Sequence, residues 1–135
     1  MTLSHSIITL NANGLRNSKN RYKLFTQLKG KADIILLQET HSQTHDEQIW
    51  PSSLGGGRMI FSHGDSNSLG VAIYLNKNAD FQITIVDIVD RLYARARGDG
   101  FSVCTHLRII RARSIHPFIM ICFGENKRDL IHLLN

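Results

Sequence analysis

Two runs of consecutive apolar residues lie within the first 40 positions of this chain. Residues 6–10, SIITL, are mostly apolar and β-branched, which predicts a buried strand. Residues 34–40, IILLQET, begin with four aliphatic side chains in a row, and such a run is typical of a strand covered on both faces. Asn13 and Gly14, which follow the first run, are a turn signal.

Between these two runs the apolar residues recur every third position. They are Tyr22, Phe25 and Leu28. Lys, Arg and other polar residues separate them, so the segment predicts an amphipathic helix. Asn17 or Ser18 is a candidate N-cap, and Gly30 ends the helix. The first 40 residues therefore predict a strand, a helix and a second strand.

Beyond residue 40 the pattern becomes strand-rich. Residues 41–58 predict a polar helix or loop, and residues 90–100, DRLYARARGDG, predict a loop. The segments predicted as strands are residues 58–64, 69–76, 81–89, 101–110 and 116–123. Because no helix separates these strands, we expect antiparallel pairing.

The final residues, 127–135, predict about two turns of amphipathic helix, a length that is marginal without something to pack on. The chain is therefore expected to form a mixed α/β sheet and to stop in the middle of a domain.

Two polar side chains mark the carboxyl ends of the first two predicted strands. Asn11 ends the first, and Glu39 ends the second. Ligands of layered α/β folds collect at this edge of the sheet, where the two side chains could meet. A carboxylate there suits Mg²⁺, which takes oxygen ligands, and an amide can donate to a phosphate oxygen. On pattern alone the alternative stays open that Glu39 is a solvated strand end and Asn11 only starts a turn.

Composition adds a basic character. The chain has 16 Lys and Arg against 11 Asp and Glu, giving a net charge of +5, which favours an anionic partner such as nucleic acid. Six arginines make residues 91–113 basic, as either a phosphate-contacting surface or a solvated loop and strand end: Arg91, Arg95, Arg97, Arg108, Arg111 and Arg113.

Other classes of site find little support. Two cysteines without a CxxC motif disfavour a zinc site or a disulfide scaffold and fit a reducing compartment. Both cysteines lie in predicted strands, where packing is their expected role. His41 and His45 are four residues apart, without an HExxH motif. Neither a signal peptide nor a membrane span is expected, and the predicted location is intracellular, in the nucleus or cytoplasm.

Three blocks of the sequence resemble the endonuclease/exonuclease/phosphatase superfamily, in order and spacing. They are ITLNANGL (residues 8–15), ADIILLQETH (32–41) and LGVAIYLNK (69–77). The chain is most similar to the N-terminal half of the endonuclease domain of non-LTR retrotransposons, which is related to abasic-site endonucleases. The resemblance covers about residues 5–81. It implies an incomplete, roughly N-terminal half of a four-layered α/β sandwich of the DNase-I-like type, truncated at the C-terminus within residues 1–135.

The resemblance also implies roles for individual residues. Glu39 matches the Mg²⁺ ligand, Asn11 the phosphate-binding or network asparagine, and Asn13, more weakly, a position near the metal. Residues 118–126 are similar to a later block, in which Phe123 replaces the active-site tyrosine and Asn126 keeps an asparagine that lies near the DNA backbone in relatives. The implied partners are DNA and a reverse transcriptase domain in the parent protein.

The family's remaining motifs, Gly-Asp-x-Asn, a later Asp and a terminal Ser-Asp-His, belong after residue 126 and do not occur there; GDSN at residues 64–67 precedes the Gly-Val-Ala-Ile block and predicts a turn. The expected function is therefore that of a truncated DNA endonuclease domain whose family reaction is Mg²⁺-dependent phosphodiester hydrolysis, catalytically incomplete in this chain. The alternatives are a non-catalytic nucleic-acid-binding module of the same fold and a phosphatase-branch member.

Overall fold

The computed structural model describes residues 6–64, 69–79, 83–89, 93–98, 101–111, 114–123 and 128–132. It contains a four-stranded sheet and a five-stranded sheet. The chain is an α/β protein, as predicted, with a mixed four-stranded sheet and two α-helices in its first part.

The first unit is a strand, a helix and a second strand, as the sequence predicts. Strand β1 is Ile7–Asn11, helix α1 is Ser18–Leu28 and strand β2 is Ile34–Gln38. The Asn17 side chain caps α1 by accepting a hydrogen bond from the Asn20 N–H, at 3.0 Å. Strands β1 and β2 pair in parallel, with Asn11 opposite Gln38.

Two more strands complete the mixed sheet. After a short 3-10 helix η1 (Thr44–Gln48) and helix α2 (Trp50–Ser53), the chain forms β3 (Arg58–Ser62) and β4 (Val71–Leu75), followed by the 3-10 turn η2 (Lys77–Ala79). The strand order is β1-β2-β4-β3, and β4 is antiparallel to both of its neighbours. None of the helices in the described ranges is long and apolar enough to cross a membrane.

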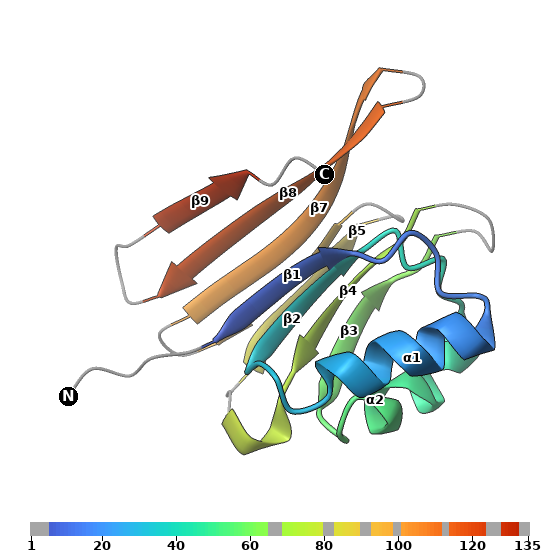
Figure 1. Cartoon of the computed structure of the whole chain (residues 1–135). Coiled ribbons are helices and arrows are strands. Elements are labelled where there is room, and N and C mark those ends of the chain that lie inside the picture. The colour runs from blue at the N-terminus through green and yellow to red at the C-terminus, as the bar shows by residue number, and fades with distance from the viewer. Residues whose placement is uncertain are drawn as a thin grey trace.

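Helices α1 and α2 cover one face of this sheet (Figure 1). Trp50 is fully buried there and meets the Phe25 ring edge-on, with ring centroids 5.7 Å apart. The side chains of Ile35 and Leu37 in β2 and Tyr74 in β4 belong to the same apolar cluster. Because neighbouring residues of a strand point to opposite faces, Ile34, Leu36 and Gln38 face away from the helices.

The second sheet lies against that other face. Its strands are β5 (Ile83–Val89), β6 (Tyr93–Gly98), β7 (Phe101–Arg111), β8 (Ser114–Phe123) and β9 (Arg128–His132), paired antiparallel in chain order. The Gln38 side-chain amide links the two sheets, since it donates both to Thr9 Oγ1 in β1 and to Thr105 Oγ1 in β7, each at 3.1 Å. The described residues thus form three layers, namely helices, mixed sheet and antiparallel sheet (Figure 1).

Three of our sequence predictions are wrong. Residues 93–98 form β6 and not a loop, because neighbours on both sides supply hydrogen-bond ladders that outweigh the weak strand preference of alternating Ala and Arg. Residues 128–132 form β9 and not a helix, because pairing with β8 satisfies a backbone that a two-turn helix would leave uncapped. The strands also divide into two sheets and do not form one.

Candidate functional site

Backbone strain is concentrated at one edge of the mixed sheet. Four non-glycine residues of the described chain have positive φ: Asn13 (53°), Glu39 (51°), His41 (54°) and Leu69 (61°). Asn13 follows β1, Glu39 and His41 follow β2, and Leu69 precedes β4. Because β4 runs antiparallel to β2, its beginning lies beside the end of β2, so all four residues occupy the same edge.

Backbone hydrogen bonds join these three segments into one unit. The Gly14 N–H donates to the Glu39 carbonyl at 2.7 Å, which connects the segment after β1 to the segment after β2. The His41 N–H donates to the Leu69 carbonyl at 2.9 Å, which connects the latter segment to the start of β4. The peptide groups around Glu39 are therefore held on both sides, although the residue itself has left the strand conformation.

This arrangement costs conformational energy. The left-handed region costs a residue with a Cβ about 1–2 kcal/mol, and asparagine tolerates it best. Glu39 and Leu69 have no such tolerance, so the surrounding hydrogen bonds and packing must offset the strain. Clusters of strained residues are typical of ligand-binding sites, where they hold side chains in orientations that relaxed backbone would not give.

The structure brings the ends of β1 and β2 together, and it gives Asn11 and Glu39 different environments. Asn11 Oδ1 accepts a hydrogen bond from the Asn13 N–H at 2.9 Å, which forms a local turn and leaves the Asn11 amide nitrogen without a partner in the described chain. Glu39 is half-buried, and among the described residues its carboxylate accepts no hydrogen bond and forms no ion pair. Among the described residues no hydrogen bond joins the Asn11 and Glu39 side chains, and Asn13 is exposed.

The donor set suits one kind of metal better than another. No cluster of three or more His, Cys, Asp or Glu side chains occurs in the part of the chain that the structure describes. Structural zinc needs such a cluster, whereas Mg²⁺ keeps several waters and binds through one or two carboxylates together with substrate phosphate. Glu39 is half-buried, and its carboxylate, which has no hydrogen bond or ion pair among the described residues, fits the second pattern.

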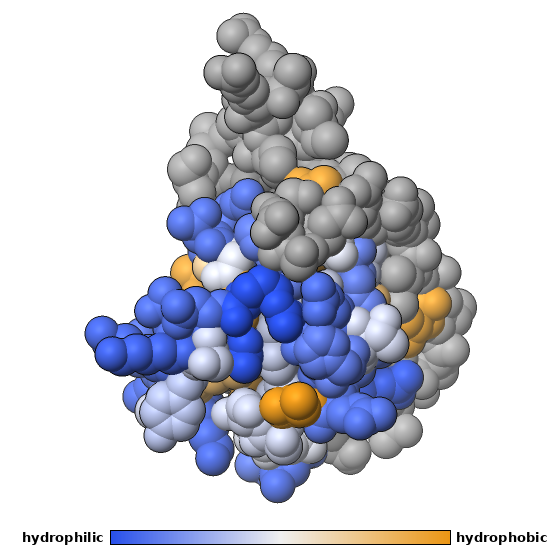
Figure 2. All heavy atoms as spheres, turned by 90° about the vertical axis from the view of Figure 1, so that its right-hand side faces the viewer, coloured by the Kyte–Doolittle hydropathy of each residue, from blue (hydrophilic) through white to orange (hydrophobic). Residues whose placement is uncertain are grey.

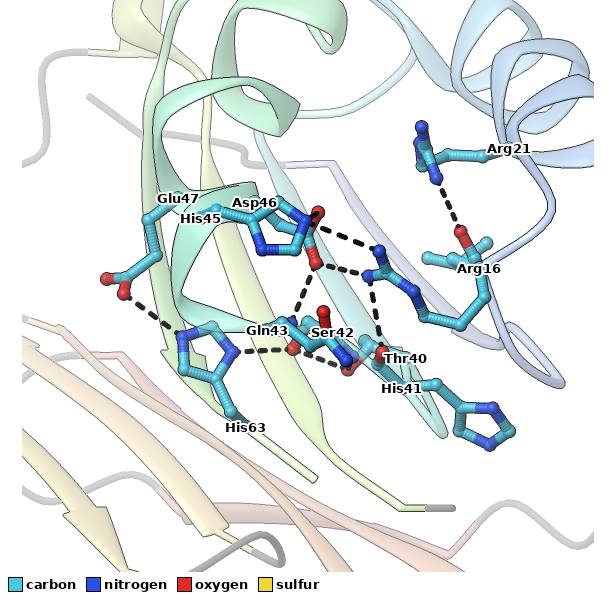
Figure 3. Close-up of polar contacts among 11 residues, drawn as sticks. Arg16, Arg21, Thr40, His41, Ser42, Gln43, His45, Asp46, Glu47 and His63 are labelled. Carbon is cyan, nitrogen blue, oxygen red and sulfur yellow. Dashed lines mark hydrogen bonds and ion pairs between the residues drawn. The ribbon is translucent and has the colours of Figure 1, made fainter. Parts of the chain in front are cut away.

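A buried carboxylate fixes the chain behind this edge. Asp46 in η1 is 2% exposed, and it forms an ion pair with Arg16, which follows β1 (Figure 3). The Gln43 N–H also donates to Asp46, at 2.7 Å, and His45 Nε2 lies 3.3 Å from its other oxygen. Since Arg16 also reaches the His41 carbonyl, at 3.5 Å, these contacts tie η1 to both strand-end segments.

A second polar row connects the same segment to β3. Thr40 Oγ1 donates to Ser42 Oγ at 3.1 Å, Ser42 Oγ lies 2.8 Å from His63 Nδ1, and His63 Nε2 lies 3.1 Å from Glu47 Oε2 (Figure 3). The order Ser, His, Glu has the connectivity of a hydrolase triad. Ser42 is 0% exposed, however, so no substrate can reach its hydroxyl, and the row acts as a structural tie.

Sequence reasoning missed both polar groups. Ser42 and His63 are 21 positions apart, and Arg16 and Asp46 are 30 apart, with no motif linking them. The one local signal is the spacing of Gln43 and Asp46, which form a capping box at the start of η1. Backbone pairing, which a sequence pattern does not report, brings the remaining partners together.

The other predicted candidates are distributed as follows. His41 and His45 do not converge: a Cβ on Gly14 would lie 2.8 Å from His41 Nδ1, whereas His45 faces Asp46. Phe123 is the last residue of β8, and Asn126 lies outside the described residues.

The two cysteines and the arginine-rich stretch fall in the second sheet. Cys104 is buried in β7, as predicted, and Cys122 lies in β8. In the arginine-rich stretch, Arg95 Nε donates to Ser102 Oγ at 3.3 Å, while Arg91 and Arg113 lie outside the described residues, as do residues 65–67 of GDSN.

Viewed from the right-hand side of Figure 1, the described surface is mostly hydrophilic and carries only small hydrophobic patches (Figure 2).

No protein-family model matches the chain, and no curated protein is significantly similar to it in sequence. Any functional assignment therefore depends on the sequence blocks and on the geometry of the strand edge.

Removing the buried carboxylate should destabilise the protein. Asp46→Ala leaves the Arg16 guanidinium and the Gln43 N–H without their acceptor, and we expect a loss of about 2–3 kcal/mol in the free energy of unfolding. The value is below that of a fully buried pair because Arg16 is 30% exposed and water solvates it in part. Urea denaturation measures this change. Glu47→Ala is the control, since the Glu47 side chain is 49% exposed and should contribute less than about 1 kcal/mol. If both variants lose the same free energy of unfolding, Asp46 does not have the stabilising role assigned to it.

Relieving the strain at Glu39 should have the opposite effect. Glycine adopts positive φ freely, so Glu39→Gly is expected to raise the free energy of unfolding by about 0.5–1 kcal/mol after the entropy cost of glycine is subtracted. Thermal or urea denaturation measures the gain. Glu47→Gly, within the 3-10 helix, should be destabilising instead. If both variants lose stability to the same extent, Glu39 carries no strain.

Proposed function

We propose that this chain carries the N-terminal portion of an endonuclease/exonuclease/phosphatase domain of the non-LTR retrotransposon type. In this proposal the edge formed by the ends of β1 and β2 and the start of β4 is the metal- and phosphate-binding half of the active site. The observation that carries the proposal is Glu39, a half-buried residue on a strained backbone at the carboxyl end of a fully buried strand, whose carboxylate has no partner among the described residues.

The unpaired charge of Glu39 supports a ligand. Glu39 is half-buried, and among the described residues its carboxylate accepts no hydrogen bond and forms no ion pair. Arg16 is committed to Asp46, and the described residues offer Glu39 no other cation. A divalent ion at Glu39 would neutralise the charge of the carboxylate. The positive net charge of the chain would favour an anionic substrate there.

The topology supports the same family and its four-layered α/β sandwich. The blocks LNANGL, LLQETH and GVAI lie far apart in sequence, yet they come together at the end of β1, the end of β2 and the start of β4. Two stacked sheets with helices on one outer face correspond to three layers of a DNase-I-like sandwich.

Each residue of the half-site has a defined task in this proposal. Glu39 would hold Mg²⁺, which supplies charge stabilisation for the scissile phosphate. Asn11 would donate its free amide hydrogens to a phosphate oxygen, while its own oxygen stays bound to the Asn13 N–H. The polar ties through Asp46 and His63 would keep the segment after β2 rigid, so that Glu39 meets the ion without rearrangement.

Hydrolysis also requires a general base for the attacking water, and such a base typically contributes about 10²–10⁴-fold to the rate. The family's Gly-Asp-x-Asn and Ser-Asp-His motifs are not found after residue 126 of this sequence. We therefore propose a chain that is competent to bind metal and phosphate and catalytically incomplete by itself. A non-catalytic nucleic-acid-binding module of the same fold is the alternative that the basic charge favours, and a phosphatase-branch member is a further one.

Metal binding at Glu39 is the first expectation. Paramagnetic Mn²⁺, added as a substitute for Mg²⁺, should broaden the amide NMR signals of residues 11–14 and 39–41 in the wild-type chain. The isosteric Glu39→Gln variant should lose this broadening. Glu47→Gln removes an equally charged side chain near the same segment and should keep it. Broadening that is unchanged in Glu39→Gln, or strongest elsewhere, would rule out the half-site.

The second expectation concerns turnover. The purified 135-residue chain should leave supercoiled plasmid intact in the presence of Mg²⁺. Nicking that disappears in Glu39→Gln would mean that the chain is a complete enzyme, contrary to the proposal of catalytic incompleteness. Nicking that persists in that variant would indicate a contaminating nuclease.

A further inference from the structure

A surface groove runs along the outer side of the helical layer, away from the strand edge. Its volume is about 620 Å³. Six side chains of α1 and its end line it: Ser18, Arg21, Tyr22, Phe25, Thr26 and Lys29. These positions follow helical spacing, so the groove extends along one whole face of α1. The opposite wall comes from Ile49, Ser52 and Ser53 at α2.

The groove exposes unusually large apolar side chains. Tyr22 is 75% exposed and Ile49 is 53% exposed, whereas the Phe25 ring behind them is buried. Among the residues whose side-chain burial the structure describes, one further large apolar side chain is exposed, Val86 at 37%. Neighbouring apolar groups that remain in contact with water mark surfaces for interaction with other molecules.

Three hydroxyls of the walls are already satisfied. Thr26 Oγ1 donates to the Tyr22 carbonyl at 2.7 Å, and the hydroxyls of Ser52 and Ser53 donate to the Ile49 carbonyl at 2.9 and 3.2 Å. Covering these hydroxyls with an apolar partner therefore leaves no donor unsatisfied. The walls behave as a largely apolar surface.

The charged side chains of the groove have a single sign. Arg21 and Lys29 line it, and none of its described lining residues is acidic. The Arg21 guanidinium is fixed in place, since it donates to the Leu15 carbonyl at 2.8 Å and lies 5.4 Å from the centroid of the Trp50 ring. Lys29, the C-cap of α1, lies eight positions after Arg21, which corresponds to about 12 Å of rise along a helix axis.

We infer that this groove binds an amphipathic helix of a partner protein, with an apolar stripe that packs on Tyr22 and Ile49 and flanking carboxylates that pair with Arg21 and Lys29. Carboxylates about two turns apart on such a helix match the spacing of the two cations. A second copy of this chain fits less well, because each copy carries a net charge of +5 and the groove is itself basic. A nucleic acid strand fits less well because Tyr22 is the single exposed aromatic side chain of the lining and two cations neutralise few phosphates. The inference does not depend on the proposed function.

The test is a selection that leaves the partner sequence open. A phage library of helical peptides of about 16 residues, long enough to span α1, is selected on the 135-residue chain and counter-selected on Ile49→Glu. The enriched peptides should be amphipathic and acidic. Affinities of synthetic copies are then measured by fluorescence anisotropy, with circular dichroism and thermal unfolding to show that each variant is folded.

The structure supplies matched controls for both kinds of contact. Ile49→Glu and Tyr22→Ala should each weaken binding about tenfold or more, while Val86→Glu, at an exposed apolar residue outside the groove, should change it less than about twofold. Lys29→Glu should weaken binding by a similar factor, whereas Lys31→Glu, two residues further and outside the lining, should not.

Several results would overturn the inference. They are a library that yields no enrichment over the counter-selected variant, enriched peptides that are basic or uncharged, and peptides that bind Ile49→Glu as well as wild type. Competition by single-stranded oligothymidine that is lost in Lys29→Glu would assign the groove to nucleic acid. A dimer in sedimentation that dissociates in Ile49→Glu would assign it to a second copy.

Discussion

Parallel pairing of β1 and β2 is the constraint on which the rest of the structure depends. Two parallel neighbours cannot be joined by a tight turn, so the chain must cross over, and α1 makes that crossing on one face of the sheet. The same pairing puts the carboxyl ends of both strands at one edge. It also buries β2 on both faces, with the helices against Ile35 and Leu37 and the second sheet against Ile34 and Leu36.

The stability of β2 allows the strain that follows it. Its four aliphatic side chains are at most 1% exposed, and burial of each contributes about 1.5–3 kcal/mol. Against that gain, the positive φ angles of Glu39 and His41 cost about 1–2 kcal/mol each. A fully buried strand thus ends directly in a segment with a strained backbone conformation, and Glu39 is the first residue of that segment. The same segment is closely packed against β4, since a Cβ on Gly70 would lie 2.7 Å from Thr40 Oγ1.

The sequence predicts elements well where the spacing of apolar residues agrees with the capping and turn residues that flank them. Strand β2 has a continuous aliphatic run, α1 has apolar residues at helical spacing after an Asn cap, and both predictions are confirmed. The sequence fails to predict an element whose conformation is set by pairing with neighbouring strands. Strand β6 is such an element, because its Ala and Arg residues have little strand preference of their own. The left-handed conformation of Glu39 could not be predicted either, because glutamate does not favour it. The hydrogen bonds that impose it are made by the next two residues, whose N–H groups donate to the Gly70 and Leu69 carbonyls. Asn11 and Glu39 could be proposed together because both end strands, whereas Ser42 and His63 meet only through the fold.

The hydrogen bond between Gln38 and Thr105 has a consequence for the order of folding. The pairings of the mixed sheet are all made between residues 7 and 75. The closest in sequence joins β3 to β4, and β1 and β2 are bridged by a helix that forms locally. The bond from Gln38 instead spans 67 positions, so the chain entropy lost in forming it is repaid only when β7 is already ordered. Until then the inner face of the mixed sheet, with Ile34 and Leu36 at its centre, is exposed to water and to other chains. The second sheet therefore buries the inner face of the mixed sheet only late in folding. Before it docks, aggregation competes with folding.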